Sequence, residues 1–140
     1  MHLKLENPRL FADLISIISE LVTEVKLHVT KEGLSLTAID PANVAMVYFK
    51  MPADLFVHFE INKEHTLGLN LENVKAVLRR CKPGASLTLK KEDNFIKFEI
   101  QDKIKRDFTL ALLDIDSEEK PMPTWEFKSV IKMDSSAFSE

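Results

Sequence analysis

The chain of 140 residues contains the same succession of predicted elements twice. The first copy opens with an alternating strand at residues 3–5, followed by Asn7-Pro8 and an amphipathic helix. The second opens with a similar strand at residues 67–69, followed by Asn70 and another amphipathic helix. Each helix precedes three runs with the two-residue alternation of strands. A repeated strand–helix–three-strand unit is a building block, and it favours a modular assembly over a self-contained enzyme.

A third copy begins near the end of the chain. Residues 130–133 are predicted to form a strand, and residues 134–138 the start of a helix. The preceding stretch 116–123 has two prolines and no periodicity, which predicts a linker. We expect either a truncated chain or a natural half that pairs with a separate polypeptide. The expected organisation is one domain over 1–116, a connector over 117–126 and the start of a second domain over 127–140.

Both predicted helices carry a single apolar stripe. In the first helix this stripe comprises Leu10, Phe11, Leu14, Ile17, Ile18 and Leu21. In the second it comprises Leu71, Val74, Val77, Leu78 and Cys81. Two short helices with eight or nine strands predict an α+β domain, and one stripe per helix places both helices on one face of the sheet.

The residues that could carry catalysis or hold a metal are scattered. His2, His28, His58 and His65 lack the spacing of a helical metal pair, and Cys81 lies on a buried stripe, so no zinc site is predicted. The three glycines lie too far apart for a phosphate-binding loop. An acidic cluster could hold a hard cation, although we favour the simpler explanation that its charges keep a linker solvated. It consists of Asp114, Asp116, Glu118 and Glu119. We therefore expect no catalytic residues and no cofactor.

Composition indicates the class of protein and the kind of compartment in which the chain works. Hydrophobic residues make up 45% and charged residues 29%, the balance of a soluble globular protein. The apolar runs are interrupted every few residues, so no membrane span is predicted. The lone Cys81 cannot form an intrachain disulfide and agrees with a reducing, cytoplasmic compartment. The net charge of −3 gives no global reason for nucleic-acid binding. Any such role must therefore rest on how the charged residues are distributed along the chain.

One short segment concentrates positive charge. Lys75, Arg79, Arg80 and Lys82 lie between Val74 and Gly84 without an acidic residue among them. Two explanations are open: a solvated helix face, or a surface that contacts phosphates. Phosphate contacts need only lysine and arginine on a common face. Because no stacking aromatic side chain or base-reading motif accompanies them, the DNA contact would be weak and independent of sequence.

Residues 38–47, with the sequence A-I-D-P-A-N-V-A-M-V, resemble the signature of the DNA sliding clamps of the PCNA family, particularly the archaeal type. Residues 67–71, 112–116 and 130–133 resemble the same family in register, so the likeness covers essentially the whole chain. The resemblance implies the DNA-clamp fold. In that fold two strand–helix–three-strand repeats place both helices on one face of a curved antiparallel sheet.

The resemblance also implies a function. Such clamps are processivity factors without enzymatic activity, and they form rings that encircle double-stranded DNA. Through short hydrophobic peptide motifs they tether DNA polymerase, ligase, flap nuclease and the clamp loader. A full-length subunit has two domains, and three subunits close the ring with the helices lining the hole. The implied location is the nucleoid in the cytoplasm, or the nucleus in a eukaryote.

The resemblance assigns roles to three groups of residues. The residues implied to face DNA are Lys75, Arg79, Arg80 and Lys82. The partner-peptide groove is implied to comprise Ile39, Val44, Met46, Met122 and Pro123. The implied subunit interface comprises Phe108, Leu110 and Leu112. The first helix departs from the family pattern, because Ala12, Asp13 and Ser19 occupy positions that are often basic.

Alternatives to the clamp remain at this point. Val44 and Met46 could simply pack in a strand. The chain could be a small interaction module that uses its edge strand and linker groove without encircling DNA. A more distant alternative is a metal-dependent hydrolase built on the acidic cluster.

Overall fold

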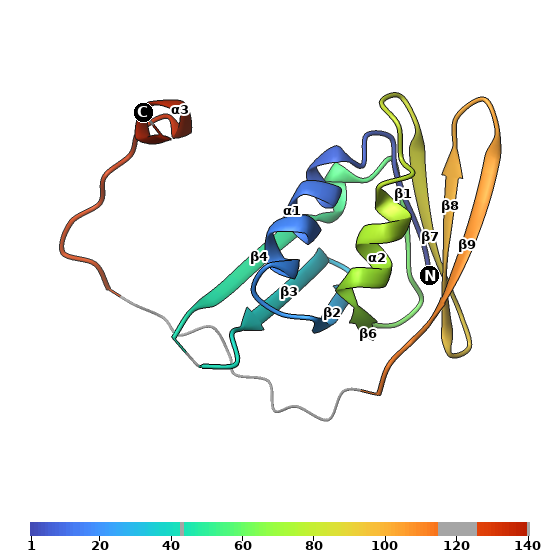
Figure 1. Ribbon diagram of the computed structural model, residues 1–140, viewed down its shortest axis with the longest axis horizontal. Helices are drawn as coiled ribbons and strands as arrows, with labels where there is room; N and C mark the ends of the chain where they lie inside the picture. The colour runs from blue at the N-terminus through green and yellow to red at the C-terminus, as the bar shows by residue number, and fades with distance from the viewer. Residues whose placement is uncertain (43, 115–125, 140) are drawn as a thin grey trace.

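The computed structural model describes residues 1–42, 44–114 and 126–139 (Figure 1). Its helices and strands confirm the predicted α+β class. In chain order they are β1 (His2–Leu5), α1 (Arg9–Ser19), β2 (Glu24–Thr30), β3 (Gly33–Ile39), β4 (Met46–Pro52), the 3-10 turn η1 (Ala53–Leu55), β5 (His58–Glu60), β6 (His65–Asn70), α2 (Leu71–Leu78), β7 (Ser86–Glu92), β8 (Phe95–Gln101), β9 (Lys105–Ala111) and α3 (Ser135–Ser139).

The strands divide between two antiparallel sheets, and the two repeats exchange their opening strands. One sheet has the order β4-β3-β2-β6, so that β6 of the second repeat pairs with β2 of the first. The other has the order β5-β1-β7-β8-β9, so that β1 of the first repeat pairs with β7 of the second. Neither repeat can complete its own sheet alone. The exchange therefore joins both repeats into one folding unit.

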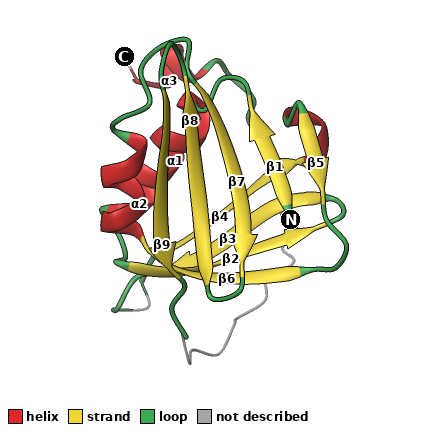
Figure 2. Ribbon diagram, turned by 90° about the vertical axis from the view of Figure 1, so that its right-hand side faces the viewer, coloured by secondary structure: helices red, strands yellow, loops and turns green. Residues whose placement is uncertain are grey.

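Both repeat helices lie on the same side of the sheets, as predicted. Figure 1 shows α1 and α2 next to each other, and Figure 2 shows them together on one side of the strands. Alternating residues of the strands point toward the helices and form a continuous core with them. Its largest fully buried side chains include Leu3, Phe11, Ile15, Ile18, Leu27 and Phe98.

Local sequence explains where α2 begins. The Asn70 side chain accepts hydrogen bonds from the backbone N–H groups of Glu72 at 3.0 Å and Asn73 at 3.3 Å. These N–H groups would otherwise lack a partner in the first helical turn, so Asn70 caps the amino-terminal end of α2. The predicted stripe is buried except at its last residue, since Cys81 is only half-buried.

The predicted stripe of α1 is partly wrong. The buried residues are Phe11, Ile15 and Ile18, whereas Leu10 is 55% exposed and Ile17 is 64% exposed. Both sides of α1 carry apolar residues at helical spacing, so periodicity alone cannot say which side turns inward. Contact with the sheets selects the side of Ile15, which the sequence prediction missed.

The predicted strand at residues 130–133 is not formed. These residues are exposed and have no regular structure, although the helix expected after them is present as α3. A strand needs a neighbour to satisfy its backbone hydrogen bonds, and residues 130–133 pair with no other described segment. The alternating sequence pattern alone was therefore not sufficient to predict a strand at residues 130–133.

Candidate DNA and partner interface

The basic segment of α2 is less exposed at its start than the sequence predicts. The side chain of Lys75 is only 21% exposed, and its Nζ lies 4.0 Å from an Oε1 oxygen of Glu20 at the end of α1. Lys75 therefore lies against the neighbouring helix rather than on the fully exposed face. Its charge is partly balanced by Glu20, which weakens any contact with a phosphate.

Three cations at the end of α2 remain exposed. Arg79 and Arg80 form the turn that follows the helix, and Lys82 lies just beyond it. The Arg80 guanidinium lies 5.3 Å from the centre of the Phe108 ring on β9. This distance fits a cation–π contact, which holds Arg80 beside the edge of the five-stranded sheet. The exposed charge of this face therefore gathers at the carboxyl end of α2.

The first helix adds little positive charge to this face. Arg9 has its Nε 3.9 Å from Asp13 Oδ2, one helical turn away. Asp13 and Glu20 are both exposed. The departure from the basic pattern noted for this helix therefore leaves a mixed surface.

Three of the predicted groove residues meet at the end of the four-stranded sheet. Ile39 of β3 lies directly opposite Met46 of β4, and both are half-buried. Val44 lies in the loop between these strands and is 85% exposed. The other two predicted groove residues, Met122 and Pro123, lie outside the described residues.

The loop that carries Val44 is fixed by a single carboxylate. Oδ1 of Asp40 accepts hydrogen bonds from the backbone N–H groups of Val44 at 2.7 Å and Ala45 at 3.0 Å. The Asp40 N–H in turn donates to the Ala45 carbonyl at 3.0 Å. Val44 therefore projects from a defined turn and not from an unconstrained segment.

The predicted interface residues lie along an edge strand. β9 ends the five-stranded sheet, and within the described residues it pairs only with β8. Phe108 and Leu110 are half-buried, with one side against the core. The strand stops at Ala111, and Leu112 beyond it donates its N–H to the Asn94 carbonyl at 2.8 Å. β4 forms the corresponding edge of the other sheet. Each edge offers unpaired backbone groups to an incoming strand.

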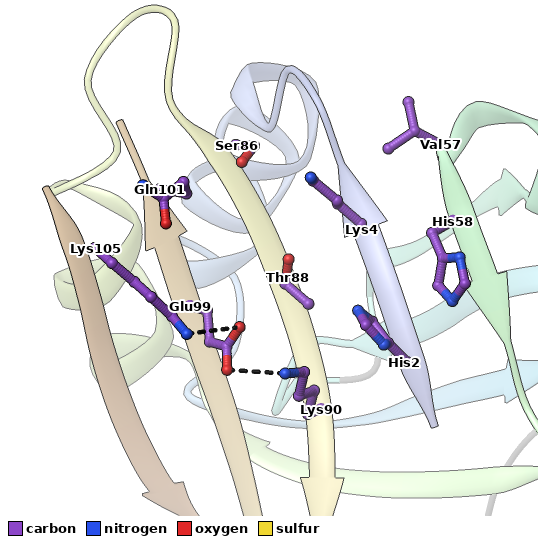
Figure 3. Close-up of a pocket in the computed structure, with 10 residues that line it drawn as sticks. All are labelled: His2, Lys4, Val57, His58, Ser86, Thr88, Lys90, Glu99, Gln101 and Lys105. Atoms are coloured by element: carbon purple, nitrogen blue, oxygen red, sulfur yellow. Dashed lines mark hydrogen bonds and ion pairs between the residues drawn. The ribbon is translucent and has the colours of Figure 1, made fainter. Parts of the chain in front are cut away.

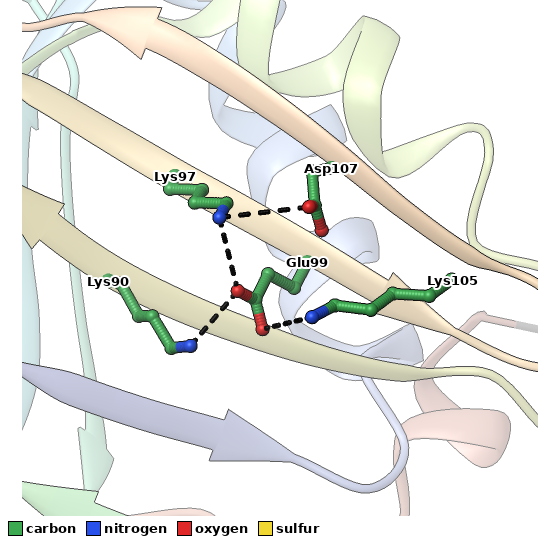
Figure 4. Close-up of polar contacts among 5 residues, drawn as sticks. All are labelled: Lys90, Lys97, Glu99, Lys105 and Asp107. Carbon is green, nitrogen blue, oxygen red and sulfur yellow. Dashed lines mark hydrogen bonds and ion pairs between the residues drawn. The ribbon is translucent and has the colours of Figure 1, made fainter.

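The face of the five-stranded sheet opposite the helices carries a charged network that the sequence prediction missed. The Glu99 carboxylate contacts Lys90 at 2.9 Å, Lys97 at 3.5 Å and Lys105 at 3.8 Å (Figure 4). Lys97 also lies 3.7 Å from Asp107. The hydrogen bond from Lys90 is the main cause that lowers the pKa of Glu99. These residues come from three strands, so strand register was needed to find them.

An open cavity of about 500 Å³ lies on the same face (Figure 3). Glu99, Lys90 and Lys105 line one side, and His2 and His58 line the other. The two imidazole rings have centroids 4.5 Å apart, and His58 Nε2 lies 3.2 Å from Glu60 Oε2. Burial, with His58 and Lys90 nearby, lowers the pKa of His2. Pairing of β1 with β5 brings these histidines together, and their sequence spacing contained no such signal.

Two further expectations concern the acidic cluster and the membrane. Of the four acidic residues proposed for a cation site, only Asp114 lies among the described residues. Within the described part of the chain, no helix has the length and apolar character needed to cross a bilayer.

Comparison with known proteins adds evidence independent of this geometry. Residues 1–119 match the family described as proliferating cell nuclear antigen, N-terminal domain. The DNA polymerase sliding clamp of Pyrococcus abyssi is 35% identical over 127 residues, which are 90% of this chain and 51% of that protein. The clamp of Thermococcus fumicolans is 36% identical over 122 residues, which are 86% of this chain and 49% of that protein. The chain thus spans about half the length of the curated relatives it matches.

Solved structures show the same fold. A chain from the PCNA2–PCNA3 complex of Sulfolobus tokodaii superposes with a TM-score of 0.85 at 28% identity. That match covers 91% of this chain and 52% of the other. The PCNA structure from Thermococcus kodakaraensis gives a TM-score of 0.83 at 26% identity, covering 89% of this chain and 51% of the other.

Proposed function

Because this chain belongs to the proliferating cell nuclear antigen family of DNA polymerase sliding clamps, we propose that it supplies the amino-terminal half of a clamp subunit. In a closed ring this half encircles double-stranded DNA and tethers replication and repair enzymes, without catalysing a reaction itself. The observation that carries the proposal is the shared face of α1 and α2, with both sheets ending in open edge strands.

The DNA contact proposed for this half is weak and independent of sequence. Arg79, Arg80 and Lys82 supply exposed positive charge at the carboxyl end of α2, and Lys75 contributes less because of Glu20. Charges of this kind contact phosphates without distinguishing bases. An encircling ring stays on DNA by topology, so a tight grip by each subunit is not required.

Ring closure is proposed to use the edge of β9. Phe108, Leu110 and Leu112 present partly exposed apolar surface beside unpaired backbone groups. A strand from the second domain of a neighbouring subunit would extend the five-stranded sheet there. Arg80 lies over Phe108, so the same contact would order a DNA-facing arginine. Within one subunit, the chain is proposed to continue from a domain over 1–116 through a connector over 117–126 into a second domain of its own, which begins within 127–140.

Partner enzymes are proposed to bind beside the other sheet. Ile39, Val44 and Met46 offer an apolar surface at the end of β3 and β4, and Met122 and Pro123 of the connector are proposed to complete it. Short hydrophobic peptides of a DNA polymerase, ligase, flap nuclease or clamp loader would dock there, with methionine adapting to several anchors. Such partners place the protein at DNA, in the cytoplasm or in a eukaryotic nucleus.

A processivity assay tests this function. The chain is combined with a second clamp domain as a separate polypeptide, a clamp loader and a DNA polymerase on a long primed template. We expect longer products per binding event than with the polymerase alone. Val44→Asp, which places a charge on the exposed apolar surface, should abolish the gain, whereas Lys31→Asp on the distant β2–β3 turn should not. Product lengths unchanged by the complete mixture would refute the proposal.

A further inference from the structure

The outer face of the five-stranded sheet carries a second site with separate chemistry. β1 and β5 pair so that His2 lies opposite Glu60 and Lys4 lies opposite His58. Leu3 of the same ladder is fully buried, so the alternation of the strands turns His2 toward the opposite, outer face. His58 and Glu60 are two residues apart on β5 and share that face. Figure 3 shows the two imidazole rings next to each other at the rim of the cavity.

The three side chains already lie close to the separations that a metal ion requires. Their potential ligand atoms all lie within 4.8 Å of one another. His58 Nε2 and Glu60 Oε2 are 3.2 Å apart. Tetrahedral zinc with ligand distances of about 2.0–2.1 Å needs ligand atoms about 3.4 Å apart. Because His58 and Glu60 are exposed and His2 is half-buried, small side-chain rotations can close the remaining gap.

The charges around the cluster are compatible with a cation. Lys4 and Lys90 lie opposite His58 and His2 in the neighbouring strands. Lys90 is engaged by Glu99 at 2.9 Å, which offsets its charge. Glu60 supplies a negative charge within the cluster itself. Its removal would leave two imidazoles beside two lysines, an unfavourable environment for a divalent ion.

We propose that His2, His58 and Glu60 form a surface binding site for Zn²⁺, with a fourth position open toward the adjacent cavity. Two imidazole nitrogens and one carboxylate oxygen suit zinc, whereas Mg²⁺ and Ca²⁺ prefer oxygen ligands alone. Water fills the fourth position in the isolated chain. The ion would link the three-residue strand β5 to β1 and so stabilise that edge of the sheet. This site is independent of the proposed clamp function.

Calorimetric titration of the whole chain with Zn²⁺ tests the site. We expect one equivalent to bind, and His2→Ala, His58→Ala and Glu60→Gln each to weaken binding by about tenfold or more, which corresponds to at least ~1.4 kcal/mol. His28→Ala is the matched control because it removes a histidine from the other sheet, and it should change the affinity less than about twofold. Mg²⁺ should give no binding heat.

A second measurement does not depend on the variants folding. In the unmodified chain, Zn²⁺ should shift the imidazole NMR signals of His2 and His58 and leave those of His28 and His65 unchanged. A chelator should restore the original spectrum. The proposal is overturned if Zn²⁺ does not bind, if the signals of His28 or His65 shift instead, or if zinc affinity survives loss of both His2 and His58.

Discussion

Arg80 links two surfaces that the sequence assigns to different roles. Its guanidinium lies over Phe108, whereas the neighbouring Arg79 is exposed and stacks on no aromatic ring of the described residues. Arg80→Lys keeps the positive charge but loses the planar group that stacks on the ring. We expect it to weaken pairing with a second clamp domain, as Phe108→Ala would, and to leave the salt dependence of DNA binding unchanged.

Arg79→Ala should have the opposite pattern of effects: it should change the salt dependence of DNA binding and leave domain pairing unchanged. Loss of one phosphate contact should make the plot of log affinity against log salt concentration less steep by about 1. Domain pairing should be unaffected. Analytical ultracentrifugation measures the pairing, and titrations with labelled DNA at several salt concentrations measure the slope. If Arg80→Lys changes the slope and not the pairing, the two arginines do not have these separate roles.

Gly33 is required by the turn between β2 and β3. Its φ is +143°, and a Cβ there would lie 2.1 Å from the Met51 carbonyl oxygen. Gly33→Ala should therefore lower the free energy of unfolding by about 1–3 kcal/mol or more, measured by urea denaturation. Gly84→Ala is the control: Gly84 also has a positive φ of +87°, but no atom lies within 4 Å of the added Cβ. Equal losses in the two variants would show that the Met51 contact does not matter.

Glu99 should make stability depend on pH. Its folded-state pKa is lowered from 4.5, chiefly by the hydrogen bond from Lys90. The charged carboxylate therefore stabilises the fold above about pH 4.5, and this contribution is lost as the pH falls through the lower folded-state pKa. Glu99→Gln should cost about 1–2 kcal/mol at neutral pH, and the deficit should shrink in acid. Denaturation of the unmodified protein and of Glu99→Gln, from neutral to acidic pH, measures this deficit. Glu24→Gln, at an exposed position, is the control. A deficit independent of pH would contradict the assignment.

Among the elements, α1 shows what sequence periodicity can and cannot determine. The helix itself was predictable, because its apolar residues recur at helical spacing. Its rotation was not, because Leu10, Leu14 and Ile17 form as regular a row as Phe11, Ile15 and Ile18. The strands were likewise predictable from alternation, but which strands pair with each other was not. The exchange of β1 and β6 between the two sheets depends on contacts between residues distant in sequence. The same limit hid the Glu99 network and the histidine pair, whereas the basic end of α2 is contiguous and was predicted.

Two isoleucines of α1 test its rotation. Ile15 is fully buried and Ile17 is 64% exposed. Ile15→Ala should lower the free energy of unfolding by about 2–5 kcal/mol, because it leaves a cavity in the core. Ile17→Ala should change it by less than about 0.5 kcal/mol in the isolated chain. Thermal and urea denaturation measure both values, and a larger loss for Ile17→Ala would mean that the other side of α1 faces the sheets.

For the molecule as a whole, the open edges of the two sheets matter most. The edge strands β4 and β9 belong to different repeats, and each pairs on one side only within the described residues. A domain with two such edges can be extended at both ends, as a ring requires, while the exchanged strands keep the domain itself intact. The chain spans about half the length of the sliding-clamp relatives that it matches.

Retention on circular DNA tests the encirclement of DNA most directly. The chain and a second clamp domain are loaded onto nicked circular DNA, and half of the sample is then cut once with a restriction enzyme. We predict that clamps stay on the circle at high salt and slide off the cut DNA, and that Arg79→Ala leaves this difference intact. Equal retention on circular and linear DNA, or loss from both at high salt, would contradict encirclement.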